Sequence, residues 1–152
     1  MTCERSSGVG PASTSWPLSS WLMLGALPTA PSCARLHTCA ILCEWGLKKL
    51  AETAALVASE LVTNAVQAST ETAVRPRLGL AVIYFRLLSD QRSVILEVWD
   101  ESPQLPVAKQ VEPDEEHGRG LVLVEALCER WGSEVVPGWN GKAVWAELLV
   151  SH

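Results

Sequence analysis

The sequence has no excess of basic residues. Lysine and arginine number 12 and aspartate and glutamate 17 among 152 residues, which gives a formal net charge of −5. A protein that holds nucleic acid presents a basic face to the phosphate backbone, and neither a basic run nor a basic stripe is present. The composition therefore argues against a direct nucleic-acid partner. A single bound nucleotide stays open, because it needs only a local site.

Long apolar runs are missing as well. The apolar stretch near the N-terminus, WPLSSWLMLGAL at residues 16–27, is too short and too interrupted to span a membrane. It also lacks the charged lead and the cleavage site that are typical of a secretory signal. We therefore expect no membrane partner and a cytoplasmic location.

Cysteine is present five times, but without a CxxC pair or a regular framework. A metal cluster of Cys33, His37, Cys39 and Cys43 is one interpretation, since all four fall in one expected helix. Cys39 and Cys43 share a helix face there, whereas Cys33 and His37 are badly placed to complete a tetrahedron. Small buried thiols in a reducing compartment are the better interpretation.

The remaining composition is typical of one folded domain. Apolar residues make up 48% and charged residues 19% of the chain, which is long enough to bury a core. Residues 1–20 are rich in serine, glycine and proline and show no periodicity. We therefore expect a disordered leader over 1–20 and a single domain over 21–152.

Hydrophobic periodicity and turn residues predict the elements of the first half. WLMLGAL, at residues 21–27, is a candidate strand. A helix over 33–47 follows, with Ser32 as its N-cap and Gly46 in the C-terminal role. A second helix is expected from residue 47 or 48 to residue 69.

The second half begins with two strand-like runs, 77–88 and 93–100, which the turn-like SDQR joins as a hairpin. A proline-containing loop over 101–118 follows, of a length that is typical of a functional lid or of disorder. A third helix is expected over 120–131. The last run, from residue 134 onward, predicts two strands around a turn at Asn140-Gly141.

This order of elements, (β)αα–ββ–loop–α–ββ, predicts the fold class. We expect an α/β (α+β) two-layer sandwich with a mostly antiparallel mixed sheet and with helices on one face.

A first candidate site lies in SELVTNAV, at residues 59–66. Glu60 and Asn64 are four residues apart and therefore neighbours on the helix surface. Asparagine is a poor residue for a helix interior, because its side chain competes for backbone hydrogen bonds. Taken alone, the pair is better explained as an exposed polar edge than as a chemical device.

Two further candidates border the long loop. Asp100 ends an apolar strand, where its carboxylate can accept a hydrogen bond from an amino group and so favour adenine over guanine; the alternative is an Asx-type turn. HGRGL, at 117–121, opens a helix with two glycines and an arginine, which suits phosphate. It is neither a Walker A loop nor a Rossmann fingerprint.

Together and in this order, the motifs resemble the ATP-binding domain shared by histidine kinases, DNA gyrase and related (GHKL) ATPases, which has the Bergerat-type fold. The segments SELVTNAV, VWDESPQLP, GRGLVLVEALCERWG and GKAVWAEL are most similar to the stand-alone anti-sigma-factor serine kinases and their single-domain ATP-binding relatives. The resemblance extends over residues 27–150, nearly the whole expected domain.

The resemblance implies a role for each candidate residue. Asn64 would bind the Mg²⁺ that bridges the ATP phosphates, and Glu60 would be the general base. Asp100 would hold the adenine amino group. The remaining members of the implied ATP site are Ser102, Gly118, Arg119, Gly120 and Leu121. Relatives often place a threonine near the adenine where this chain has Ala143, so one hydrogen bond to the base is expected to be missing or to come from water.

Two functions follow from the resemblance. The first is an ATP-dependent serine/threonine kinase that transfers the γ-phosphate to a serine of a partner, an anti-sigma antagonist. The alternative is a non-catalytic ATP-binding module that docks to a sigma factor or another transcriptional regulator. Relatives of this kind often form dimers, so a homodimer is a further possibility.

Overall fold

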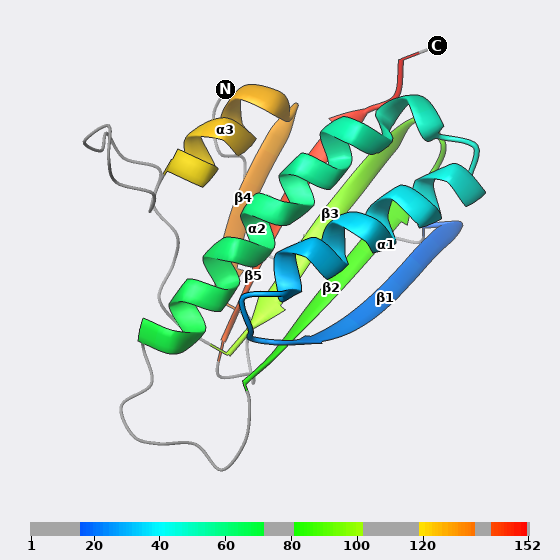
Figure 1. Ribbon diagram of the computed structural model, residues 1–152. Helices are drawn as coiled ribbons and strands as arrows, with labels where there is room; N and C mark the ends of the chain where they lie inside the picture. Colours follow the sequence, from blue (N-terminus) through cyan, green and yellow to red (C-terminus); the bar gives the residue numbers. More distant parts are fainter. Residues whose placement is uncertain (1–15, 72–80, 102–118, 136–140, 152) are drawn as a thin grey trace.

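The computed structural model describes residues 16–71, 81–101, 119–135 and 141–151. A five-stranded sheet forms one layer, and the helices lie together on one of its faces (Figure 1). The elements are β1 (Leu18–Gly25), α1 (Ala30–Glu44), the 3-10 turn η2 (Lys48–Leu50), α2 (Ala51–Glu71), β2 (Val82–Ser89), β3 (Ser93–Asp100), α3 (Arg119–Leu127), β4 (Arg130–Val135) and β5 (Lys142–Leu149).

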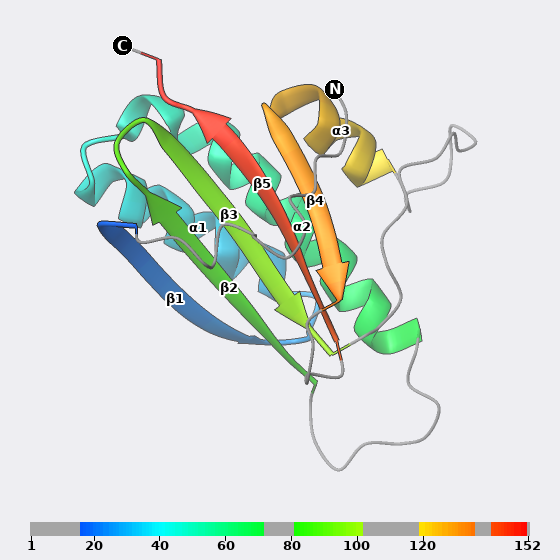
Figure 2. The ribbon, with the colours of Figure 1, turned by 180° about the vertical axis from the view of Figure 1, so that it is seen from behind.

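The strand order in the sheet is β1-β2-β3-β5-β4. Every pairing among the described strands is antiparallel, so the predicted two-layer α+β fold is confirmed, although the sheet has no parallel pair within the described residues. From the far side, Figure 2 shows the sheet face that the helices leave uncovered. Strand β5 lies between β3 and β4, which brings the end of β3 beside the start of β5.

The core lies between the helices and the sheet because alternate strand residues point to opposite faces. Leu96 and Val98 of β3 point to the helices and are fully buried. Small residues of α2, such as Ala54 and Ala58, let the helix approach the sheet closely. The buried side chains of this core cluster come from α1, α2, α3 and all five strands. The largest of those that are fully buried are Phe85, Leu42, Leu61, Ile83, Leu87 and Leu96.

The start of α1 differs from the prediction. The helix begins at Ala30, with Thr29 as its N-cap, and no side chain caps it. Pro31 in the first turn suits this start, because its fixed backbone angle is that of a helix and its missing N–H would have no partner there. Ser32, the predicted cap, lies inside the helix, and its Oγ accepts a hydrogen bond of 3.0 Å from Arg35 Nη2.

The end of α1 follows the prediction. Gly46 has a φ of +77°, a left-handed conformation that favours glycine, and the chain there turns from α1 toward η2. Strand β1 precedes α1 in the sequence and begins at Leu18. It therefore includes three residues of the segment 1–20 that was expected to be a disordered leader.

The third helix is shorter than predicted. It ends at Leu127, and Trp131, which was expected in its last turn, is a buried residue of β4. The backbone passes from helix to strand within two residues, since Cys128 N donates to Val124 O (2.9 Å) and Glu129 N donates to Glu147 O (2.8 Å). The apolar spacing of the sequence continues through this change, so the helical pattern did not mark the boundary.

No helix within the described ranges is long and apolar enough to cross a membrane.

Candidate functional site

Glu60 and Asn64 lie on one face of α2, one turn apart, as the spacing predicted. Their neighbours Leu61, Val62 and Ala65 are buried against the sheet, so the two polar side chains lie at the border of the core. Both are half-buried rather than exposed, which the interpretation as an exposed polar edge does not explain.

The amide nitrogen of Asn64 is buried and has no hydrogen-bond partner among the described residues. Its Nδ2 atom is inaccessible to solvent and has no partner among the described residues, and the same holds for Oγ of Ser69, five residues further along α2. A buried polar group without a partner costs about 1–3 kcal/mol, so native proteins rarely keep one unless a ligand or water satisfies it. The C-terminal half of α2 therefore has hydrogen-bonding capacity that the rest of the described chain does not use.

The carboxyl group of Glu60 is partly buried. Burial raises its pKa above the ordinary value of 4.5, because a low-dielectric environment disfavours the charged form. A carboxyl group with a raised pKa accepts a proton more readily than an exposed one does. This is the property that a general base needs.

The residue before Glu60 is tied to α1. Ser59 Oγ accepts a hydrogen bond of 2.9 Å from Arg35 Nη1, which fixes the first helix against the second at this point. Arg35 thus contacts the residue that directly precedes Glu60 in the sequence.

Asp100 is fully buried at the end of β3, on the face that the helices cover. Its carboxylate does not stand alone: Lys142 Nζ lies 3.0 Å from Oδ1 and 3.0 Å from Oδ2. The two residues are register partners across β3 and β5. Figures 1 and 2 both show the end of β3 and the C-terminal end of α2 at the same end of the molecule.

Sequence reasoning missed Lys142. The signal for it is the alternation of GKAVWAEL: Lys142 has the same phase as Val144 and Ala146, which point into the core. A lysine in the apolar phase of a strand is buried and needs a carboxylate partner. Ala143, where relatives often have a threonine, pairs with Trp99 and lies on the other face of the sheet from Asp100.

Gly141 holds the start of β5 against the end of β3. A Cβ atom at this position would lie 2.0 Å from the carbonyl oxygen of Asp100 and 2.8 Å from Cα of Glu101. Only glycine permits this approach, because the atoms in the way belong to the backbone.

The proposed phosphate segment is described only in part. Arg119, Gly120 and Leu121 form the first turn of α3, which packs beside α2. Ser102 and Gly118 lie outside the described residues, so their predicted roles stay predictions.

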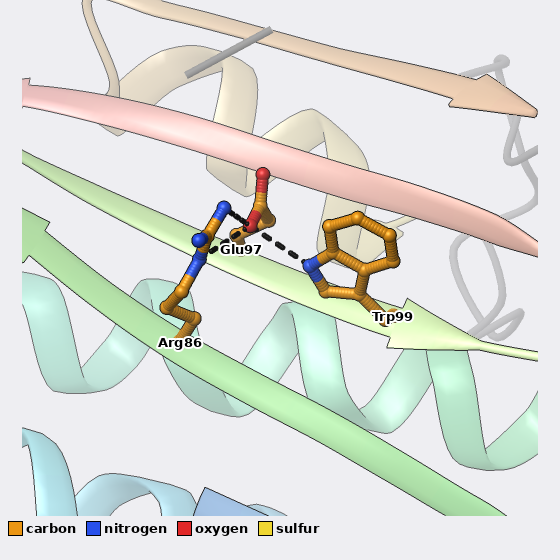
Figure 3. Close-up of polar contacts among 3 residues, drawn as sticks. All are labelled: Arg86, Glu97 and Trp99. Carbon is orange, nitrogen blue, oxygen red and sulfur yellow. Dashed lines mark hydrogen bonds and ion pairs between the residues drawn. The ribbon is translucent and has the colours of Figure 1, made fainter. Parts of the chain in front are cut away.

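A second buried carboxylate lies on the opposite face of the sheet. Figure 3 shows Glu97 of β3 between Arg86 and Trp99. Glu97 Oε1 accepts hydrogen bonds from Arg86 Nε (2.7 Å) and from Trp99 Nε1 (2.8 Å), and Arg86 Nη2 pairs with the same oxygen. The Arg86 guanidinium also stacks 4.7 Å from the ring centre of Trp21. This cluster joins β1, β2 and β3.

A hollow of about 760 Å³ opens elsewhere, and its lining includes Leu47, Lys49, Gln91 and Val150. It lies beside the start of α2 and the far end of β5, whereas Asp100 and Lys142 lie at the opposite end of the sheet. Within the described residues, none of the buried polar atoms that lack a hydrogen-bond partner belongs to its lining.

The cysteines are free thiols where they are described. Cys33 and Cys43 are exposed, so the expectation of buried thiols was wrong for them, while burial raises the pKa of Cys128 to about 12. Within the described ranges, no group of three or more histidine, cysteine, aspartate or glutamate side chains is arranged to hold a metal ion.

Comparison with known proteins adds a family. The profile of the histidine kinase-like ATPase domain matches residues 26–147, most of the chain. No curated protein matches the chain at a significant level. The fold is similar to the crystal structure of the RsbU and RsbW domains of Rv1364c from Mycobacterium tuberculosis, with a TM-score of 0.58 and 22% identity. That match covers 89% of this chain and 33% of the other, so this chain spans about a third of that length.

Proposed function

The chain belongs to the histidine kinase-like ATPase family, and on this basis we propose that it binds Mg²⁺-ATP and transfers the γ-phosphoryl group to a serine or threonine of a partner protein. The family supports the nucleotide, and the likeness to a structure that contains an RsbW domain supports a regulatory setting. The observation that carries the proposal is the buried Nδ2 atom of Asn64, which has no partner within the described part of the chain and lies one turn from Glu60.

The residues present fit a magnesium-bound triphosphate. Asn64 offers one hard oxygen to the cation and one N–H donor to a phosphate oxygen, so binding would satisfy the group that the described residues leave unpaired. Magnesium would neutralise phosphate charge and leave the γ-phosphorus open to attack. Arg119 and the start of α3 would add positive charge and backbone N–H groups, together with Gly118, Gly120 and Leu121.

The base of the nucleotide would meet Asp100. A carboxylate accepts about four hydrogen bonds, so pairing with Lys142 is compatible with a further bond from the adenine amino group. Ser102, just beyond the strand, would complete this side of the pocket.

Glu60 would act on the partner's hydroxyl group. It would take the proton while the hydroxyl oxygen forms its bond to phosphorus and ADP leaves. Because burial raises the pKa of Glu60, the rate of transfer should increase with pH through a range above the usual titration of glutamate and then reach a plateau. The partner would be an anti-sigma antagonist, and the regulated protein a sigma factor.

The proposal is tested with Glu60→Gln, which keeps the size of the side chain and removes the base. We expect Mg²⁺-ATP to raise the melting temperature of both proteins equally. Transfer of ³²P to a serine-containing partner should decrease by about 10²–10⁴-fold in the variant. Equal transfer by both proteins would refute the role of Glu60, and no thermal shift with Mg²⁺-ATP would refute nucleotide binding.

A non-catalytic docking module is the second candidate. It predicts binding of Mg²⁺-ATP without transfer by the unmutated protein, and a partner affinity that Glu60→Gln leaves unchanged. Surface plasmon resonance with the partner, in the presence and absence of nucleotide, separates this outcome from kinase activity.

A further inference from the structure

Lys142 and Asp100 form an ion pair that is almost completely removed from water. The exposed fractions of the two side chains are 3% and 1%, and the ammonium nitrogen lies at the same distance, 3.0 Å, from both carboxylate oxygens. The lysine thus restrains both oxygens of the carboxylate.

The backbone holds the pair in place. Asp100 and Lys142 face each other across β3 and β5, and Gly141, the residue before the lysine, packs directly on the backbone of Asp100. The backbone positions that carry the two side chains are therefore held next to each other.

The pair favours the ionised form of the carboxyl group. A buried ionised carboxylate without a cation is costly and takes up a proton instead. An ionised carboxylate only accepts hydrogen bonds, whereas a protonated one also donates. The 6-amino group of adenine needs an acceptor. A neutral carboxyl group keeps one accepting oxygen, but a charged carboxylate forms the stronger hydrogen bond.

We propose that Lys142 is a positioning residue for purine recognition. By keeping Asp100 ionised and fixed through both oxygens, it makes the site prefer nucleotides with an amino group at position 6 of the ring. This inference rests on the proposed binding of ATP, and it adds Lys142 as the residue that sets the preference for a 6-amino purine.

The test compares two ligands on each variant. Dissociation constants are measured by titration calorimetry with Mg²⁺ for ATP and for purine riboside triphosphate, which lacks the 6-amino group. The unmutated protein should bind ATP tighter by at least about tenfold, the value of one charge-assisted hydrogen bond. In Lys142→Met this ratio should fall several-fold, because a neutral carboxyl group that the lysine no longer restrains accepts a weaker hydrogen bond than a charged one.

The ratio separates positioning from stability, since a merely loosened fold weakens both ligands alike. Lys49→Met, an exposed lysine beside the hollow at the other end of the sheet, is the matched control and should keep the full ratio. Lys142→Arg keeps a cation and should also retain the preference.

Several outcomes overturn the inference. An unchanged ratio in Lys142→Met refutes it while leaving ATP binding intact, and tighter binding of ATP by that variant identifies the lysine as a competitor of the base. If circular dichroism shows that Lys142→Met does not fold, Lys142→Arg decides, and loss of its preference counts against the proposal. If the unmutated protein binds neither ligand, the proposed function fails and this inference with it.

Discussion

Strand β3 carries two buried carboxylates, Glu97 and Asp100, and they serve different ends. Glu97 lies in the middle of the strand on the sheet face that the helices leave uncovered. The guanidinium group of Arg86 and the indole N–H of Trp99, both from strands of the sheet, donate hydrogen bonds to it. Asp100 is the last residue of the strand on the helix-covered face, and a lysine of β5 holds it. One strand thus supplies a structural anchor and a candidate ligand contact, and position along the strand separates the two roles.

Burial works against the ion pair of Glu97. Burial raises the pKa of Glu97 although Arg86 and Trp99 both favour the charged form. Desolvation therefore outweighs the attraction, as expected for a pair taken out of water. We infer that the cluster fixes the geometry of the strands more than it adds to stability.

The largest effect should come from removing one member of this cluster. Glu97→Ala leaves Arg86 and the Trp99 indole without their acceptor, and we expect a loss of about 3 kcal/mol in the free energy of unfolding. Urea denaturation followed by circular dichroism measures it. The double variant Arg86→Leu/Glu97→Leu should recover most of the loss, and a double variant as unstable as the single one would contradict this account.

A smaller loss of stability is expected at the Asp100 end. In Gly141→Ala the new methyl group collides with the backbone of β3, and overpacking of this kind costs about 1–3 kcal/mol. The variant should also bind Mg²⁺-ATP more weakly, which Glu97→Gln should not. Gly46→Ala is the control: it has open space but a positive φ, so it should lower stability without changing nucleotide binding.

The pH dependence of stability sharpens the comparison further. Because the pKa of Glu97 is raised in the folded state, that state binds the proton more tightly than the unfolded chain does. Its contribution is therefore fully present below about pH 4.5 and is lost as the pH rises through the raised value. The free energy of unfolding is measured by urea denaturation at several pH values for the unmutated protein and for Glu97→Gln. The difference between the two proteins should change with pH in this range. A constant difference would show that Glu97 does not titrate there.

The smallest effect is expected for an ion pair at the edge of the same sheet. Arg130 bonds to Glu147 at 2.7 Å, but the arginine side chain is 43% exposed. Exposed pairs contribute about 0–1 kcal/mol, so Arg130→Ala should change the free energy of unfolding by about 0.5 kcal/mol. A loss as large as that of Glu97→Ala would show that exposure is not what separates these pairs.

The sequence predicts best where a short pattern and the tertiary structure agree. The bounds of β3, from Ser93 to Asp100, were predicted correctly because alternation and a following proline-rich segment both mark them. The neighbouring positions of Glu60 and Asn64 follow from helix geometry alone. Alternation also placed Asp100 correctly as the last residue of the strand, while its contact with adenine stays a prediction.

The failures have physical causes of the same kind. Trp131 continues the apolar spacing of α3, but pairing with β5 places it in a strand, and no local signal shows this pairing. Lys142 escaped attention because its partner is 42 positions away in the sequence. The predicted cap at Ser32 was wrong because Pro31 already starts the helix by itself.

Trp99 has a practical consequence. Its indole is held 2.8 Å from Glu97 on one face, while its backbone joins directly to Asp100, whose side chain lies on the other. Indole fluorescence responds to nearby charge and to hydration, so a ligand that shifts the end of β3 changes a signal that requires no added dye. Because the chain has seven tryptophans, the signal of Trp99 is isolated by comparing the unmutated protein with Trp99→Phe, and the difference then reports association and release at the end of β3 in real time.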